Sequence, residues 1–216
     1  PCVGDLHGKL ASGFDVHNST YVLCFRRLDD QRLFCQGLKR KDKESFCIAL
    51  NEVGVLAGLT GTARSIIKFD RETSLAKSNL VGLVLAKLGM LCHFGLPNKK
   101  VASAEQTVRV VMEYTRSTLF DTGLDERHRV PIGQTACARY NWNLGHEGKF
   151  NKLDPYEVWL GMLSVIAMPK EWRKLHGFKN DYFRCCVGVP VGIDASCTAG
   201  VIVEIAGPKG RVIVTS

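Results

Sequence analysis

The stretch from Tyr21 to Cys35, YVLCFRRLDDQRLFC, carries the clearest strand signal in the first part of the chain. Its first five residues form an apolar run, Asp29 and Asp30 make a turn, and the segment from Arg32 leads back. Apolar runs on both sides of a short polar turn are typical of an antiparallel hairpin. We therefore expect a hairpin near the beginning of the chain.

The end of the chain repeats this signal. Residues 201–206 and 211–215 are rich in Val and Ile and flank the Gly207-Pro208-Lys209-Gly210 turn. Residues 183–193 read as strand pieces around Pro190. Glycine and proline between β-branched runs favour a hairpin, so β structure is expected to close the chain.

Two further strands are expected between the first hairpin and the middle of the chain. The apolar run Phe46–Leu50 reads as a strand that follows the charged segment Lys39–Lys43. A fourth strand is expected over Arg64–Phe69.

The middle of the chain favours helices. Leucines at helical spacing predict a helix over about residues 73–92. Ser103 followed by Gln106 is a capping box for a helix that ends near Ser117. Residues 118–153 read as an irregular loop.

Two more helices are expected before the last strands. Asp154 and Pro155 predict the start of a helix that ends before Pro169. A short helix is then expected from Pro169 to Gly177. The order of strands, helices and strands predicts an α+β fold: antiparallel strands at both ends of the chain flank a helical middle, in a single compact domain over residues 1–216.

Charge is the strongest functional signal in the composition. The 216 residues include 29 Lys and Arg against 21 Asp and Glu, which gives a net charge of +8. A basic protein of this kind favours anionic partners, with RNA first and an acidic lipid surface second. The 45% hydrophobic content is enough for a buried core and argues against a disordered chain.

The cysteines and apolar runs predict the compartment. An odd number of cysteines, nine, cannot pair completely within one chain, and several lie inside apolar runs. This pattern favours a reducing compartment, and we expect a cytoplasmic protein. No signal peptide is recognised, and the apolar stretch 80–94 is interrupted by Lys87 and too short to span a bilayer.

Two basic segments are the candidate sites for nucleic acid or an anionic surface. Cations neutralise phosphates, and aromatic faces stack bases. The first segment has four cations and the second has cations interleaved with aromatic residues; the candidate residues are Lys39, Arg40, Lys41, Lys43, Lys170, Trp172, Arg173, Lys174, Lys179 and Arg184. The alternative interpretation is a solvated charged surface without a ligand.

The sequence Gly4-Asp5-Leu6-His7-Gly8 resembles the opening metal-binding motif of the metallophosphoesterases. In that family the Asp and the His bind a metal, so the resemblance implies this role for Asp5 and His7. The family's later Gly-Asp and Gly-Asn-His motifs are missing from this chain.

The alternative function is a cysteine-dependent hydrolase. Cys197 lies in a run of small residues, and its position late in the chain resembles that of the nucleophile in viral chymotrypsin-like cysteine proteases. The resemblance implies Cys197 as the nucleophile and His17 or His7 as the base. Beyond this alternative, no metal-ligand spacing and no phosphate-binding loop are present, so neither a metal nor a cofactor is expected.

The sequence therefore favours a non-catalytic intracellular protein that binds an anionic polymer or surface, RNA before membrane. A viral nucleocapsid or matrix-type structural protein has this composition. The strands at the chain end also predict self-association through sheet edges into a homo-oligomer.

Overall fold

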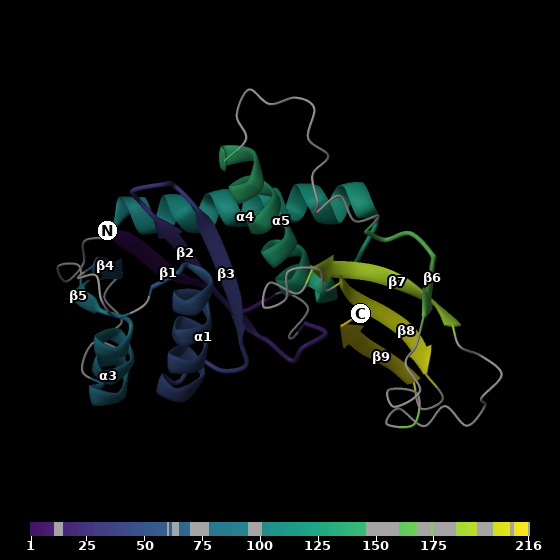
Figure 1. The fold of residues 1–216 in the computed structure, drawn as a ribbon, viewed down its shortest axis with the longest axis horizontal. Helices are drawn as coiled ribbons and strands as arrows, with labels where there is room; N and C mark the ends of the chain where they lie inside the picture. The colour runs from purple at the N-terminus through teal and green to yellow at the C-terminus, as the bar shows by residue number, and fades with distance from the viewer. Residues whose placement is uncertain are drawn as a thin grey trace.

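The fold is described from a computed structural model of the chain. The structure describes residues 1–10, 15–59, 61, 65–69, 78–94, 101–145, 160–167, 174, 185–193, 201–207 and 210–215. Two β-sheets and four α-helices make up these parts (Figure 1).

A five-stranded sheet forms the first half of the fold. Its strands, in the order β3-β2-β1-β4-β5, are β1 (Cys2–His7), β2 (Tyr21–Arg27), β3 (Leu33–Leu38), β4 (Ser65–Phe69) and β5 (Met90–Phe94). The predicted early hairpin is confirmed by the antiparallel β2–β3 pair, in which Cys24 lies opposite Cys35. The expectation of antiparallel pairing is wrong for part of the sheet, because β1–β4 and β4–β5 are parallel.

The chain changes direction between β1 and β4. After β1 it adds β2 and β3 on one side, and then it crosses to β4 and β5 on the other side. A point at which the strand order reverses in this way is a topological switch point, where open sheets commonly hold their ligands beyond the carboxyl ends of the strands.

Helix α1 (Lys43–Leu56) replaces the strand that was expected over Phe46–Leu50. The Asp42 side chain accepts the backbone N–H of Ser45 at 2.7 Å and begins the helix. Its buried residues Phe46, Leu50 and Val53 recur at helical spacing and pack on the sheet. The apolar run was therefore one face of an amphipathic helix.

The predicted helix over residues 73–92 is only partly correct. Helix α3 covers Asn79–Lys87, and residues 90–94 form β5. Gly89 has a positive φ of 67°, a conformation that ends the helix and that glycine adopts without strain. Helices α1 and α3 pack together on one face of the sheet (Figure 1).

Two helices cover the opposite face. Helix α4 spans Ala102–Thr122, five residues beyond the predicted end, and no side-chain cap from Ser103 is seen. A 3₁₀ turn, η1 (Glu126–His128), leads into α5 (Arg129–Gly145). The expected irregular loop over residues 118–153 is therefore wrong for residues 118–122 and 129–145. Val111 and Met112 of α4 share a core with Cys24, Cys35 and Cys137.

The second sheet is antiparallel and has the order β6-β7-β8-β9. Its strands are β6 (Ser164–Ala167), β7 (Cys185–Ile193), β8 (Val201–Gly207) and β9 (Gly210–Thr215). The final hairpin is confirmed, and β7 confirms the strand expected around Pro190. The helix expected from Asp154 to Pro169 is wrong over β6, whereas its first part and most of the short helix after Pro169 lie outside the described residues.

Close contacts join the second sheet to α5. The backbone N–H of Ile193 donates to Thr135 Oγ1 at 2.9 Å, and a Cβ on Gly192 would lie 2.8 Å from Pro131 Cβ. The fold class is therefore confirmed as α+β with strands at both ends of the chain around a helical middle. Among the described helices, none has the length and apolar character that a bilayer span needs. The division of the chain into domains stays a prediction.

Candidate functional site

The first basic segment lies at an exposed turn between β3 and α1. Lys39, Arg40, Lys41 and Lys43 are all exposed. Asp42, the one acid among them, is held at the start of α1, where its hydrogen bond from the backbone of Ser45 lowers its pKa. The segment therefore presents its cations to solvent, while its carboxylate is occupied with the helix start.

Of the second basic segment, the structure describes only Lys174. Lys174 is exposed. The other predicted residues, Lys170, Trp172, Arg173, Lys179 and Arg184, lie outside the described residues, as does Cys197. Of the residues that the cysteine hydrolase alternative needs, the structure describes only the two candidate bases, His7 and His17.

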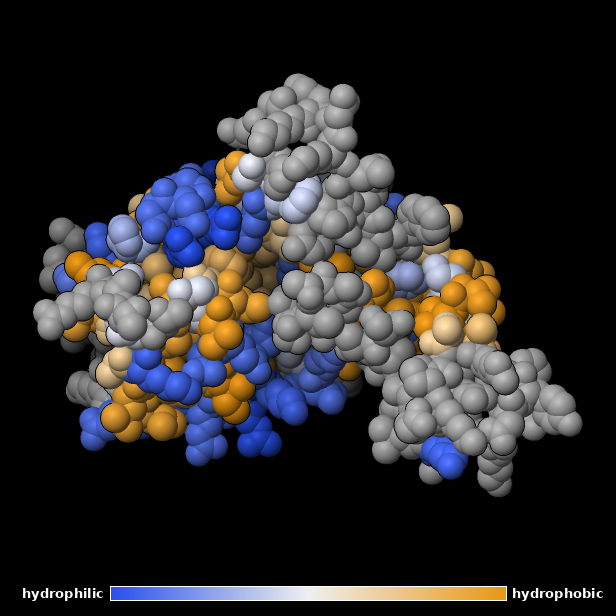
Figure 2. Space-filling model, in the orientation of Figure 1, coloured by the Kyte–Doolittle hydropathy of each residue, from blue (hydrophilic) through white to orange (hydrophobic). Residues whose placement is uncertain are grey.

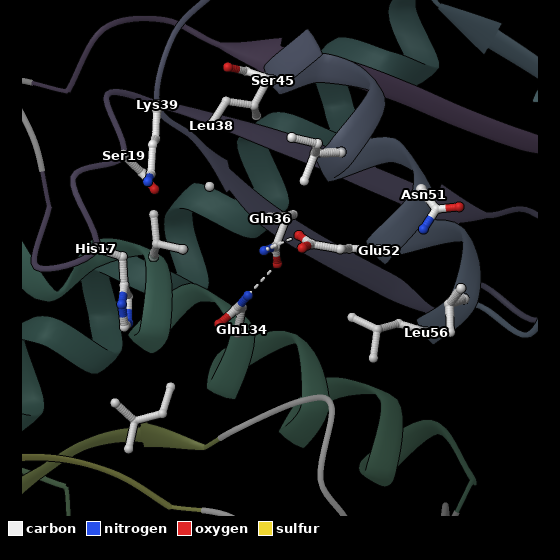
Figure 3. A pocket seen from close by; sticks show the side chains of 15 residues that line it. His17, Ser19, Gln36, Leu38, Lys39, Ser45, Asn51, Glu52, Leu56 and Gln134 are labelled. Carbon is white, nitrogen blue, oxygen red and sulfur yellow. Dashed lines mark hydrogen bonds between the residues drawn. The ribbon is translucent and has the colours of Figure 1, made fainter. Parts of the chain in front are cut away.

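An open cleft of about 890 Å³ lies between α1, β3 and α5, and Ile202 of β8 is among its lining residues (Figure 3). His17 and Lys39 lie toward one side of it and Asn51 and Glu52 toward the other. The structure thus brings a predicted anion-binding residue, Lys39, and a predicted base, His17, to the same cleft.

A chain of side-chain hydrogen bonds crosses this cleft. Gln134 Nε2 donates to Gln36 Oε1, and Gln36 Nε2 donates to Glu52 Oε2 at 2.6 Å. Beside these hydrogen bonds, Ile48 and Val55 of α1 are 61% and 65% exposed. The cleft has the mixed polar and apolar walls of a binding surface, and its lining contains no pair of a nucleophile and a base at hydrogen-bond distance among the described residues.

A second site lies at the switch point of the large sheet and centres on Asp5. The parallel pairing of β1 with β4 ends at Gly4 opposite Phe69. Asp5 is therefore the first residue of β1 beyond the carboxyl end of β4, while it still pairs with Cys24 of β2. Its Oδ1 accepts the backbone N–H of Leu6 at 2.8 Å, which orients the carboxylate.

The Asp5 side chain lies on the face of the sheet that α4 and α5 cover. Side chains alternate along a strand, and Val3, two residues before Asp5, is fully buried. The buried thiol of Cys24 belongs to the core under α4 and α5; burial raises its pKa well above the usual value, and the nearby Cys35 and Asp5 add to this effect. Burying a charged carboxylate costs free energy, so the half-buried position of Asp5 inside a strand calls for an explanation.

Helix α4 packs against β1 on this same face. Glu105 is exposed and is the one acidic residue in the first turn of α4. Its neighbour Ala104 is fully buried, so the first turn of the helix packs against the rest of the fold. Asp5 and Glu105, together named the acidic site, thus come from two elements that are in contact.

His7 lies on the same face of β1 as Asp5. Burial lowers its pKa, and the guanidinium groups of Arg129 and Arg116 lower it further. This lowered pKa favours the neutral imidazole at pH 7. The resemblance to metallophosphoesterases implied metal binding by Asp5 and His7 together; among the described residues, no group of three His, Cys, Asp or Glu could hold a metal ion.

Two carboxylates still suit one kind of cation. Magnesium is commonly bound by one or two protein carboxylates together with substrate phosphates and water. Asp5 and Glu105 are carboxylates of the kind that this chemistry uses. Asp70 follows Phe69 directly in the sequence and lies outside the described residues.

Sequence reasoning found part of this site. Asp5 was singled out through the Gly-Asp-Leu-His-Gly motif, whereas Glu105 was passed over as an ordinary residue of a helix. The signal that could have found it is its place in the first turn of a helix that follows the last parallel strand. That signal has meaning only once the strand order is known.

Comparison with known proteins adds little. No family model matches the chain, and no curated protein matches it. Among solved structures, the chain is similar to one in the simian T-cell lymphotropic virus intasome in complex with PP2A regulatory subunit B56 gamma. The identity is 11% and the TM-score is 0.46, over 100% of this chain and 81% of the other. A likeness of this size assigns neither a family nor a function.

Proposed function

We propose that the chain binds nucleic acid and acts on its phosphodiester backbone with magnesium at the acidic site. The observation that carries this proposal is the position of Asp5, which lies at the switch point, just beyond the carboxyl end of β4. Ligands and catalytic groups of open sheets concentrate at such a point.

The chemistry of the site supports a phosphate substrate. Asp5 and Glu105 would hold the metal, which would supply Lewis-acid chemistry by neutralising charge on the phosphate oxygens. The residues of the chain would hold the cation and orient it through the fixed Asp5 carboxylate. The net charge of +8 favours a polyanion over a small phosphate ester.

The non-catalytic function that the sequence favoured stays a second proposal. In this version the chain binds RNA, or an acidic lipid surface, through the exposed cations from Lys39 to Lys43 and the segment 170–184, as a nucleocapsid or matrix-type protein does. Self-association through strand edges and a reducing, cytoplasmic location also stay proposals. Seven of the cysteines within the described residues are free thiols, which fits such a compartment.

One experiment separates the two versions. The purified protein is incubated with labelled single-stranded and duplex oligonucleotides, of DNA and of RNA, in Mg²⁺ or in EDTA. The first proposal predicts metal-dependent cleavage or joining of strands. It also predicts that Asp5→Asn and Glu105→Gln each lower the rate by at least about 10- to 100-fold, the loss that follows when even outer-shell partners of metal ligands are removed.

A matched control lies on the same helix. Glu113 is two turns beyond Glu105, exposed and paired with Arg109, so Glu113→Gln should leave the rate unchanged. Asp70→Asn is a further variant that is chosen from the sequence alone. If nucleic acid binds and no strand is cut in any metal, the catalytic proposal is wrong and the binding protein remains.

A further inference from the structure

The crossing of α4 and α5 forms an open groove of about 440 Å³, named here the α4–α5 groove. One stripe of α4 lines it, with Tyr114, Ser117 and Asp121. One stripe of α5 lines it as well, with Arg139, Tyr140 and Asn143. Residues three or four apart lie on the same face of a helix, so each helix turns a continuous row of side chains toward the groove.

Two tyrosines form the aromatic wall of the groove. The rings of Tyr114 and Tyr140 lie 5.4 Å apart at an angle of 62°, in an edge-to-face pair. Tyr140 packs on the core under α4 and α5, whereas Tyr114 is 47% exposed. An edge-to-face contact uses at most one face of a ring, so Tyr114 keeps a face for a planar ligand.

The polar groups of the groove suit the edge of a nucleobase. Arg139 and Asn143 lie one turn apart on α5, and guanidinium and amide groups are the usual partners of base edges. Asp121 approaches from α4 and accepts hydrogen bonds, as carboxylates do from the amino groups of bases. The same carboxylate repels a phosphate, so the base and not the backbone suits this groove.

Figure 2 shows apolar side chains gathered over β6 and β7, whereas the exposed residues of α4 include several charged ones. Arg109 and Arg116 are among the exposed residues of α4. Cations on the same helix would contact the nucleic acid backbone next to a bound base.

We propose that the α4–α5 groove binds an unpaired base of single-stranded nucleic acid, stacked on Tyr114 and recognised along its edge by Asp121, Arg139 and Asn143. The inference rests on the proposed nucleic-acid substrate and assigns it an unpaired segment. A base in a duplex is already stacked on both sides and does not enter such a groove without being unstacked.

The test is fluorescence anisotropy in EDTA with a labelled single-stranded DNA of about 12 nucleotides and a hairpin duplex of the same sequence. Tyr114→Ala is expected to weaken binding to the single strand about tenfold, the effect of losing one stacked base. Tyr114→Phe keeps the ring and should bind like the unchanged protein. The hairpin should bind equally to all three.

The matched control is Phe120→Ala. Phe120 lies on the same helix, is 88% exposed and does not line the groove, so this variant should bind like the unchanged protein. The fold of each variant is checked by its melting temperature. An equal loss in Tyr114→Ala and Phe120→Ala, or an equal loss for single strand and hairpin, overturns the groove as a base site.

A second substitution tests the base edge. Asp121→Asn should reduce the preference for oligonucleotides rich in cytosine, whose amino group donates, over thymine homopolymers. If Tyr114→Ala binds the single strand unchanged while Asp5→Asn abolishes cleavage, the groove assignment fails alone. If Tyr114→Ala weakens binding and no cleavage is seen with any metal, only the catalytic proposal fails.

Discussion

His128 Nε2 lies 2.7 Å from Glu204 Oε2, and this contact ties the start of α5 to strand β8 of the second sheet. The imidazole is buried, with 4% of its side chain exposed, and its Nδ1 lies 3.1 Å from Asp125 Oδ1. The hydrogen bond between this buried imidazole and Glu204 helps to hold the second sheet against the helical layer.

The first prediction concerns this contact. His128→Ala removes the hydrogen bond between the buried imidazole and Glu204, and losing one member of a buried hydrogen bond costs about 1–3 kcal/mol. Urea unfolding should show a lower midpoint at an unchanged slope. Glu113→Gln, which breaks the exposed pair with Arg109, is the control and should change stability by no more than about 0.5 kcal/mol. Equal effects of the two substitutions would contradict the buried contact.

The second prediction concerns a glycine in the same interface. A Cβ on Gly192 would lie 2.8 Å from Pro131 Cβ and 2.9 Å from Pro131 O, so Gly192→Ala should cost about 1–3 kcal/mol through overpacking. Gly82 of α3 has open space around its Cβ position, so Gly82→Ala should add about 0.5–1 kcal/mol to helix stability. Thermal unfolding of both variants measures the difference. A stabilised Gly192→Ala would show that β7 does not press on α5.

The third prediction is a pH dependence that arises from Asp15. The residue is 1% exposed, and its Oδ1 accepts the backbone N–H groups of Ser19 and His17 at 2.7 and 3.0 Å. Burial raises its pKa, and its Oδ2 has no hydrogen-bond partner among the described residues. Because the folded pKa is raised, the folded state loses stability as the pH rises through that pKa, above about pH 4.

Asp15→Asn keeps the accepting oxygen and removes the buried charge. We expect the variant to melt higher than the unchanged protein at pH 7, by an amount that corresponds to about 1 kcal/mol. The two should differ less at pH 4, where Asp15 itself becomes neutral. Melting curves between pH 4 and pH 7 test this, and a difference that does not change with pH would refute it.

The fourth prediction ranks the cysteines by reactivity. Burial raises the pKa of Cys2 to about 11 and that of Cys92 to about 12, whereas Cys185 is exposed. Since the thiolate is the reactive form, iodoacetamide at pH 8 should label Cys185 well before Cys2 and Cys92. Peptide mass spectrometry after short reaction times gives the order.

The same measurement tests the alternative function. A catalytic Cys197 would be labelled faster than Cys185, because a nucleophilic thiol has a depressed pKa. Labelling of Cys197 at an ordinary rate would remove the cysteine hydrolase. Unfolded protein, in which every cysteine should react, is the control.

The sequence correctly predicted the strands that are joined by clear turns. It gave wrong elements where tertiary contacts decide whether a segment forms a strand or a helix. Asp29-Asp30 and Gly207–Gly210 marked both hairpins correctly. The run Phe46–Leu50 was misread because five apolar residues fit a strand or a helix equally well. The helix start at Asp42 was the signal that separated the two.

Helix α5 was missed for a different reason. Its buried face is built from small and polar residues such as Gly133, Thr135 and Ala136, which give little hydrophobic periodicity. Gly133 lies close to Cys35, with its Cβ position 3.1 Å from that sulfur, so close packing replaces large side chains. The acidic site depends in turn on the order of the strands, and no local pattern contains that order.

The last prediction concerns the two basic segments. Each phosphate contact adds about 0.7–0.9 to the slope of log K against log salt. Lys39→Gln with Lys43→Gln removes two exposed charges at the start of α1, and the slope should fall by about 1.5. Arg173→Gln with Lys174→Gln tests the other segment in the same way. Lys87→Gln, at the end of α3, is the single-charge control and should leave the slope unchanged. An unchanged slope in both double variants would mean that neither segment contacts phosphate. The phosphate backbone of the nucleic acid would then be expected to bind on the surface of α4.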